Sequence, residues 1–303
     1  MPTPGAWAGI AGQANVSLTL RAEEKMSSIY KKTKSGYCRI CGNYRKLSED
    51  HIPPEKCFNE ATIFVNKPYN TTIDKGLRIK SICEKCNNSI LGGNYDNELK
   101  LLVHEIDKYY LLRYQKNVLF KKVSITISKE RIVKSILGHV LSCYGTQEDL
   151  SKSFNKEIDC YSNRMRKYVL GEENGFEKEI KIVFWLHPYR TIKVIPYFIF
   201  TELLNSETSI QGSLFSFYPI GIWIINKNNY RLLSILNEKV NEIIIDKSDD
   251  LKVDMDLIKD EDFPFSILKN KKSIAILYND KSIIHGLKSE YYKRTQILRY
   301  GTY

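Results

Sequence analysis

The sequence has no hydrophobic run of membrane-spanning length and no typical secretory leader. Its apolar stretches stop short of the roughly 18 residues that a spanning helix needs. Residues 1–25 lack the basic start and the long apolar centre of a signal peptide. Because their Ala- and Gly-rich composition differs from the Lys-, Ile- and Asn-rich remainder, we expect them to be an added leader or extension, with Met26 as the natural start. These absences predict a cytoplasmic protein that does not bind membranes.

Disulfide bonds are also disfavoured. Seven cysteines are an odd number, and a cytoplasmic protein is kept reduced. Under these conditions a Cys-x-x-Cys pair favours metal binding or catalysis over a disulfide. Two such pairs occur, Cys38/Cys41 and Cys83/Cys86. The remaining cysteines stand alone, and we interpret them as small apolar core residues: Cys57, Cys143 and Cys160.

An excess of positive charge is confined to one part of the chain. The 303 residues carry a net charge of +11. Residues 26–136 hold 21 Lys and Arg against 11 Asp and Glu, whereas residues 137–303 hold 23 against 22. The excess therefore lies in the part that contains the paired cysteines. Such a local excess indicates a surface that faces a polyanion such as nucleic acid, whereas a general basic bias would be spread evenly.

Apolar periodicity predicts a mixed α+β fold. Residues 97–115 and 129–145 have the apolar spacing of helices, and Asp96 or Asn97 is in position to cap the first helix. Apolar runs predict strands at 121–128, 177–189, 191–204, 213–226 and 273–280. The chain length favours two domains. We expect an N-terminal domain at residues 26–118 and a C-terminal α/β domain of unknown family at residues 119–303.

The two Cys-x-x-Cys pairs predict a structural Zn²⁺ site. Four thiolates supplied as two such pairs are the usual ligands of a tetrahedral structural zinc. Gly42 follows the first pair, where a glycine tolerates the left-handed backbone of a metal-binding knuckle. The distance between the pairs exceeds that of a simple zinc ribbon, so a folded segment must separate them. Coincidental buried cysteines and a redox dithiol are the alternatives, and no thioredoxin-like βαβ pattern supports the second.

Further candidate residues accompany both pairs. Asp50 and His51 lie between them in the segment Asp-His-Ile-Pro-Pro, and Asn87 directly follows Cys86. In this order, the residues resemble the HNH (His-Me finger, ββα-metal) endonucleases, and most closely the zinc-containing branch that includes endonuclease VII. The resemblance covers residues 37–110, roughly a quarter of the chain, and implies a ββα-metal module.

The resemblance implies a role for each residue. His51 would be the general base that activates water, while Asp50 and Asn87 would hold a catalytic Mg²⁺ or Mn²⁺. The residue types suit this chemistry, because an imidazole titrates near neutral pH and hard divalent cations prefer oxygen ligands. The zinc would be structural, joining the loop of Asp50 and His51 to the helix start that carries Asn87. Outside this context, a His beside an Asp is usually a hydrogen-bonded surface pair, and we assign no role to His139.

The chain also departs from the family pattern. Many members have a further Asn before the second Cys pair, where this chain has Arg78, which we interpret as a phosphate contact or a solvated strand residue. Some members have an acidic metal ligand near Asp96 and Glu98, but a capping Asp and an exposed Glu are the simpler interpretation. Basic residues around the first pair are candidate nucleic-acid contacts: Lys31, Lys32, Lys34, Arg39, Arg45 and Lys46.

The expected function is metal-dependent hydrolysis of phosphodiester bonds in double-stranded DNA, in a bacterial antiviral-defence or mobile-element nuclease. The C-terminal domain has no recognised motif, and we expect it to regulate the nuclease, select the target or form a homodimer. RNA stays open as a substrate. The alternative is a non-catalytic, zinc-stabilised module that binds nucleic acid or protein and does not need Asp50, His51 or Asn87.

Overall fold

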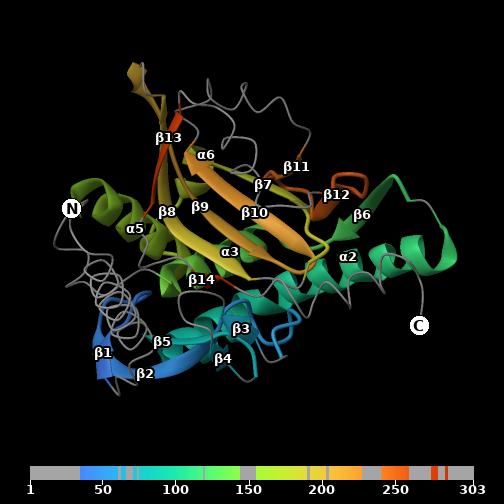
Figure 1. Ribbon diagram of the computed structural model, residues 1–303. Helices are drawn as coiled ribbons and strands as arrows, with labels where there is room; N and C mark the ends of the chain where they lie inside the picture. Colours follow the sequence, from blue (N-terminus) through green and yellow to red (C-terminus); the bar gives the residue numbers. More distant parts are fainter. Residues whose placement is uncertain are drawn as a thin grey trace, which may run out of the picture.

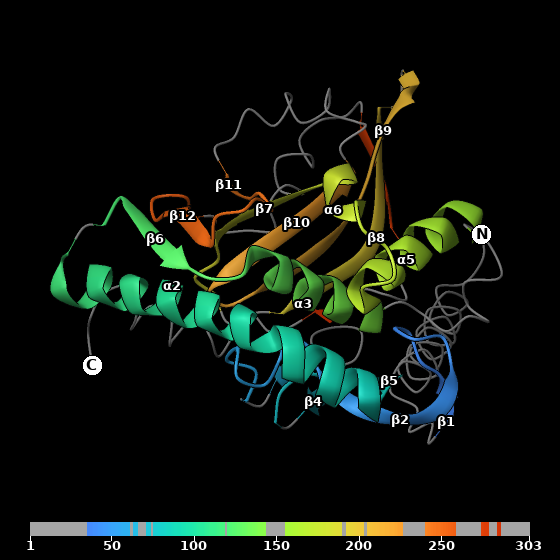
Figure 2. The ribbon, with the colours of Figure 1, turned by 180° about the vertical axis from the view of Figure 1, so that it is seen from behind.

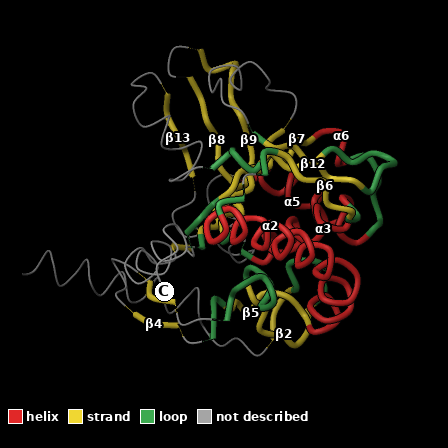
Figure 3. Tube along the Cα trace, turned by 90° about the vertical axis from the view of Figure 1, so that its right-hand side faces the viewer, coloured by secondary structure: helices red, strands yellow, loops and turns green. Residues whose placement is uncertain are grey.

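The computed structural model contains helices and antiparallel sheets, which confirms the predicted mixed α+β class. Figure 3 shows a helical layer between a small sheet, which contains β2 and β5, and a large sheet, which contains β8 and β9. The structure describes residues 35–60, 63–65, 71–73, 75–118, 120–143, 155–189, 192–202, 205–226, 240–258, 274–278 and 284–285. None of the helices within these residues is long and apolar enough to cross a membrane.

The paired cysteines lie in the loop between the first two strands of a small sheet, at the end of its last strand, and in the helix that follows. Figure 1 shows this sheet and the helical elements beside it. The sheet has the order β1-β2-β5, and its strands are β1 (Ser35–Tyr37), β2 (Tyr44–His51) and β5 (Arg78–Cys83). A separate hairpin, β3 (Ile63–Val65) and β4 (Thr71–Ile73), forms the folded segment between β2 and β5. Strand β5 leads into a π-helix, η1 (Lys85–Tyr95), and then directly into α2 (Asp96–Lys116).

The large sheet has the order β11-β7-β10-β9-β8-β13, and β14 pairs with β8. Its strands are β7 (Ile180–Leu186), β8 (Lys193–Glu202), β9 (Asn205–Phe217), β10 (Ile220–Asn226), β11 (Asn241–Ile243), β13 (Ile274–Tyr278) and β14 (Ile284–His285). Most side chains of β7 and β10 are buried on both faces, which explains their continuous apolar runs. A turn of helix, α6 (Phe176–Glu179), precedes β7, and a separate two-stranded sheet pairs β6 (Lys122–Thr126) with β12 (Asp250–Asp254).

Helix α3 (Lys129–Ser142) is central to the molecule. It packs against η1, α2 and α5 (Asn155–Leu170), and it also contacts β5, β8 and β9. Figure 2 shows α3 between α2 and the large sheet. Gly138 permits its close approach to η1, because a Cβ atom at this position would lie 2.3 Å from Cδ2 of the buried Leu91. Helix α3 therefore joins the small sheet to the large one.

One hydrophobic core extends from Cys38 to Met255. It crosses the boundary predicted between residues 118 and 119, and α3, beyond that boundary, packs on the N-terminal elements. The division into two domains stays a prediction.

Candidate metal centre and adjoining site

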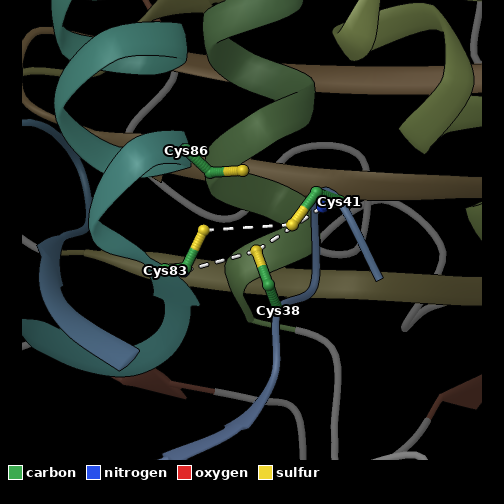
Figure 4. Close-up of side chains that lie close together, drawn as sticks. All are labelled: Cys38, Cys41, Cys83 and Cys86. Carbon is green, nitrogen blue, oxygen red and sulfur yellow. Dashed lines mark hydrogen bonds between the residues drawn. The ribbon is translucent and has the colours of Figure 1, made fainter. Parts of the chain in front are cut away.

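Four cysteines come together where the loop before β2 meets the end of β5 (Figure 4). Cys38 and Cys41 belong to the loop, Cys83 ends β5, and Cys86 lies in the first turn of η1. Their sulfur atoms all lie within 4.8 Å of one another, and Sγ of Cys41 is 3.9 Å from Sγ of Cys83. Zinc–sulfur bonds of about 2.3 Å in a tetrahedron put the sulfur atoms about 3.8 Å apart. This four-cysteine centre can hold a metal ion, and its size is compatible with structural zinc.

Two backbone N–H groups point at the sulfur atom of Cys38. The backbone N–H groups of Cys41 and Cys83 donate to Sγ of Cys38 at 3.5 and 3.3 Å. The hydrogen bond with Cys86, helped by these backbone donors, lowers the pKa of Cys38 to about 4. The same hydrogen bond, together with burial, raises the pKa of Cys86 above its usual range. The thiolate form of Cys38 is therefore favoured over its thiol form. Zinc binding would deprotonate the other three cysteines.

Helix α5 braces the knuckle formed by the first Cys pair. Gly42 has a φ of +72°, the left-handed conformation predicted for it. Nε of Arg166 on α5 donates to the carbonyl oxygen of Ile40 at 3.0 Å. A Cβ atom on Gly42 would lie 2.4 Å from Nη2 of Arg166, the end of a flexible side chain that can move, so the backbone angle is the feature that favours glycine.

Asp50 belongs to a buried network that the sequence patterns did not reveal. Its Oδ2 lies 3.2 Å from Nδ1 of His139 on α3, and Nε2 of the same imidazole lies 3.1 Å from Oδ1 of Asp96. The hydroxyl of Ser135 donates to that Asp96 oxygen at 2.7 Å. Asp50 is 2% exposed and His139 is fully buried. Burial alone would lower the pKa of His139, but the two carboxylates raise it to about 10, so a cationic imidazole bridges them.

Asn87 lies beside β2. Its Nδ2 donates to the carbonyl oxygen of Glu49 at 2.9 Å and to Oγ of Ser48 at 3.2 Å. The Glu49 carbonyl belongs to the peptide bond that leads into Asp50, so Asn87 is joined to the strand just before the Asp-His pair. Within the described residues, no hydrogen bond joins the Asn87 side chain to that of Asp50.

His51 and Asp50 leave β2 on opposite faces, as neighbouring strand residues do. The register pairs Asp50 with Ile79 and His51 with Arg78. Asp50 and Ile79 share the buried inner face, whereas His51 shares the outer face with Arg78 and Glu49. His51 is half-buried, and its imidazole has no hydrogen bond or ion pair in the described part of the chain.

The predicted nucleic-acid contacts have different surroundings. Arg78 is partly exposed, and its Nη1 lies 2.8 Å from Oε2 of Glu49. Arg45 and Lys46 are exposed on β2, and Arg39 is half-buried in the knuckle. The other three candidates, Lys31, Lys32 and Lys34, lie outside the described residues.

The predicted helix cap at Asp96 or Asn97 is wrong. The helix continues upstream into η1, and the backbone N–H of Asp96 donates to the carbonyl oxygen of Leu91, so no free helix start exists there. The predicted exposure of Glu98 is also wrong, because its side chain is only 19% exposed. Its Oε2 accepts the backbone N–H of Ser128 at 3.0 Å, at the residue that precedes α3.

The isolated cysteines differ in their burial. Cys57 and Cys143 are buried, as predicted. Cys160 is exposed on α5, so its predicted place in the core is wrong. His104 lies on α2, where its Nε2 is 2.8 Å from the carbonyl oxygen of Lys56.

Comparison with known proteins gave no relative. No protein-family model matches the chain, and neither the curated proteins nor the solved structures gave a match. A functional assignment therefore depends on the residues and their contacts.

Proposed function

We propose that the protein is a metal-dependent endonuclease of the HNH type that hydrolyses phosphodiester bonds in DNA. The main support is the hydrogen bond from Nδ2 of Asn87 to the carbonyl oxygen of Glu49, because it brings Asn87 next to the Asp-His pair at the end of β2. The four-cysteine centre supports the same arrangement, since it ties the loop that enters β2 to the start of η1.

Three polar groups near the end of β2 are available for chemistry. The imidazole of His51, Oδ1 of Asp50 and Oδ1 of Asn87 make no hydrogen bond to any described residue. The small sheet ends at the pair of His51 with Arg78, which places the partly exposed His51 at this end, while the buried Asp50 would meet a cation from the inner face.

The proposed roles follow from the residue types. His51 would accept the proton of the attacking water, and Asp50 and Asn87 would hold the divalent cation through their Oδ1 atoms. Bound Mg²⁺ or Mn²⁺ would neutralise charge on the scissile phosphate and on the leaving oxygen. The exposed Arg45 and Lys46, on the same strand as His51, attract the phosphate backbone.

Plasmid nicking tests the proposal. Supercoiled plasmid is incubated with wild type, His51→Gln or His104→Gln, in Mg²⁺, Mn²⁺ or EDTA. His104→Gln is the matched control, because it makes the same chemical change on α2 and can keep a donor for the Lys56 carbonyl oxygen. Loss of the general base should slow nicking by about 10²–10⁴-fold, with the control close to wild type. Nicking that persists in EDTA or is unchanged in His51→Gln contradicts the mechanism.

A non-catalytic, zinc-stabilised binding module is the second candidate. The burial of Asp50 and its contact with His139 favour it, because one oxygen of the proposed metal ligand is already occupied. This function predicts that the wild type retards DNA in a gel-shift assay but does not nick it in any metal. If His51→Gln binds DNA as tightly as wild type, this result supports the binding module only when wild type also fails to nick DNA.

A further inference from the structure

Three elements converge on one buried imidazole. Strand β2 supplies Asp50, α3 supplies His139 and α2 supplies Asp96, with distances of 3.2 and 3.1 Å to the two ring nitrogens. Because the imidazole is planar and rigid, hydrogen bonds at both nitrogens fix its orientation. The oriented imidazole in turn fixes the position of Oδ2 of Asp50. His139 lies on α3, beyond residues 37–110, which resemble the nuclease family.

The network is not itself a metal site. The two ring nitrogens of His139 face different carboxylates, so one cation cannot replace the imidazole's contacts with Asp50 and Asp96. The cysteines form the only group of three or more converging ligand side chains of the His, Cys, Asp and Glu types within the residues described. His139 is also fully buried, so it cannot touch a nucleic acid directly. Any effect of His139 on the reaction must pass through Asp50.

We propose that His139 is a positioning residue, which holds Asp50 so that its Oδ1 and that of Asn87 can bind the catalytic divalent cation. The inference rests on the proposed function and adds helix α3 to its site. Residues that orient a metal ligand typically change metal affinity or activity by about 10–100-fold when they are replaced. Gly138, the residue before His139, allows the approach of α3 to η1 that brings the imidazole to Asp50.

Two replacements of His139 separate positioning of Asp50 from general support of the core. His139→Asn keeps a donor near the position of Nδ1, which faces Asp50, whereas His139→Gln keeps one near Nε2, which faces Asp96. Both lose the same charge. Ser135→Ala is the matched control. It removes the hydrogen bond that Ser135 donates to Asp96 in the same network, and it changes no contact of Asp50.

Mn²⁺ binding to the full-length, zinc-loaded protein is measured by electron paramagnetic resonance without DNA, and plasmid nicking is measured in parallel. We expect His139→Gln to weaken Mn²⁺ binding by about 10–100-fold, with a much smaller effect in His139→Asn and none in Ser135→Ala. Equal weakening in both His139 variants, or wild-type binding in His139→Gln, overturns the inference. Circular dichroism checks whether each variant folds. If His139→Gln does not fold, the comparison uses His139→Asn and Asp50→Asn. The inference about His139 is then overturned if these two variants bind Mn²⁺ equally weakly.

The two proposals fail in different ways. If the expected order of Mn²⁺ affinities is found but wild type does not nick DNA, the proposed reaction is wrong and the role of His139 stands. If His51→Gln abolishes nicking while His139→Gln changes neither nicking nor Mn²⁺ binding, only the inference about His139 is wrong. Wild type that binds no Mn²⁺ overturns both.

Discussion

Replacing Gly138 with Ala should destabilise the protein, although alanine is the better helix former. The new Cβ would lie 2.3 Å from Cδ2 of Leu91, well below the ordinary carbon–carbon contact of about 3.5–4.0 Å. Leu91 is fully buried and cannot swing into water. Overpacking of this kind costs about 1–3 kcal/mol, while the change from Gly to Ala in a helix contributes about 1 kcal/mol in return. We expect a net loss of about 1 kcal/mol, within a range of about 0–2 kcal/mol.

Urea unfolding followed by tryptophan fluorescence measures this loss, since Trp185 and Trp223 are buried. A double-mutant cycle with Leu91→Ala is the control. Leu91→Ala alone should cost about 2–5 kcal/mol, and the methyl group that Gly138→Ala introduces should fill part of the cavity. The double variant should therefore be more stable than the sum of the single effects by about 1–2 kcal/mol. A Gly138→Ala protein about 1 kcal/mol more stable than wild type, with additive effects, refutes the close packing of α3 on η1.

Three further changes test other contacts. His139→Leu leaves the buried carboxylate of Asp50 and the partly exposed carboxylate of Asp96 without their imidazole partner. The free energy of unfolding in urea should fall by about 3–5 kcal/mol; adding Asp50→Asn should restore part of it, and no restoration would speak against the network. Gly42→Ala strains the knuckle, so a colorimetric zinc indicator should report release of the metal at lower chelator concentration than for wild type; unchanged release contradicts the predicted strain. The hydrogen bond from Arg164 lowers the pKa of Glu179. At pH values above the usual glutamate pKa, this partly exposed pair should contribute up to about 1 kcal/mol to stability, and it should lose this contribution as the pH falls through the lowered pKa. Glu179→Gln should therefore lower the stability measured in urea more at pH 7 than at pH 3, and a loss of equal size at both values rules out this pair as its source.

The four-cysteine centre could be predicted because its pattern is local. Each Cys-x-x-Cys pair sits within four residues, and the glycine after Cys41 indicates the backbone of a knuckle. To predict the assembled four-cysteine centre, one had only to assume that the two pairs meet in the fold. The strands β7 and β10 were predictable for a similar reason, since continuous apolar runs indicate burial on both faces.

The contact between Asp50 and His139 could not be predicted in this way, because the two residues are 89 positions apart. One signal was present. His139 lies on the same helical face as Ile132, Ile136 and Cys143, which are all buried. A histidine on a buried face needs a polar partner, so a distant acidic residue was to be expected, though not which one. Asp96 was misinterpreted as a cap because the helical apolar spacing begins only after it, whereas the structure continues the helix upstream through η1.

The metal content of the purified, full-length protein tests the four-cysteine centre most directly. This centre includes Cys86, the residue before Asn87. Elemental analysis of wild type should find about one zinc per chain. Cys86→Ser should lose it, whereas Cys160→Ser, which changes the exposed cysteine on α5, should keep it. A folded wild-type protein without bound metal, or a Cys86→Ser protein with wild-type zinc content, would contradict the four-thiolate centre.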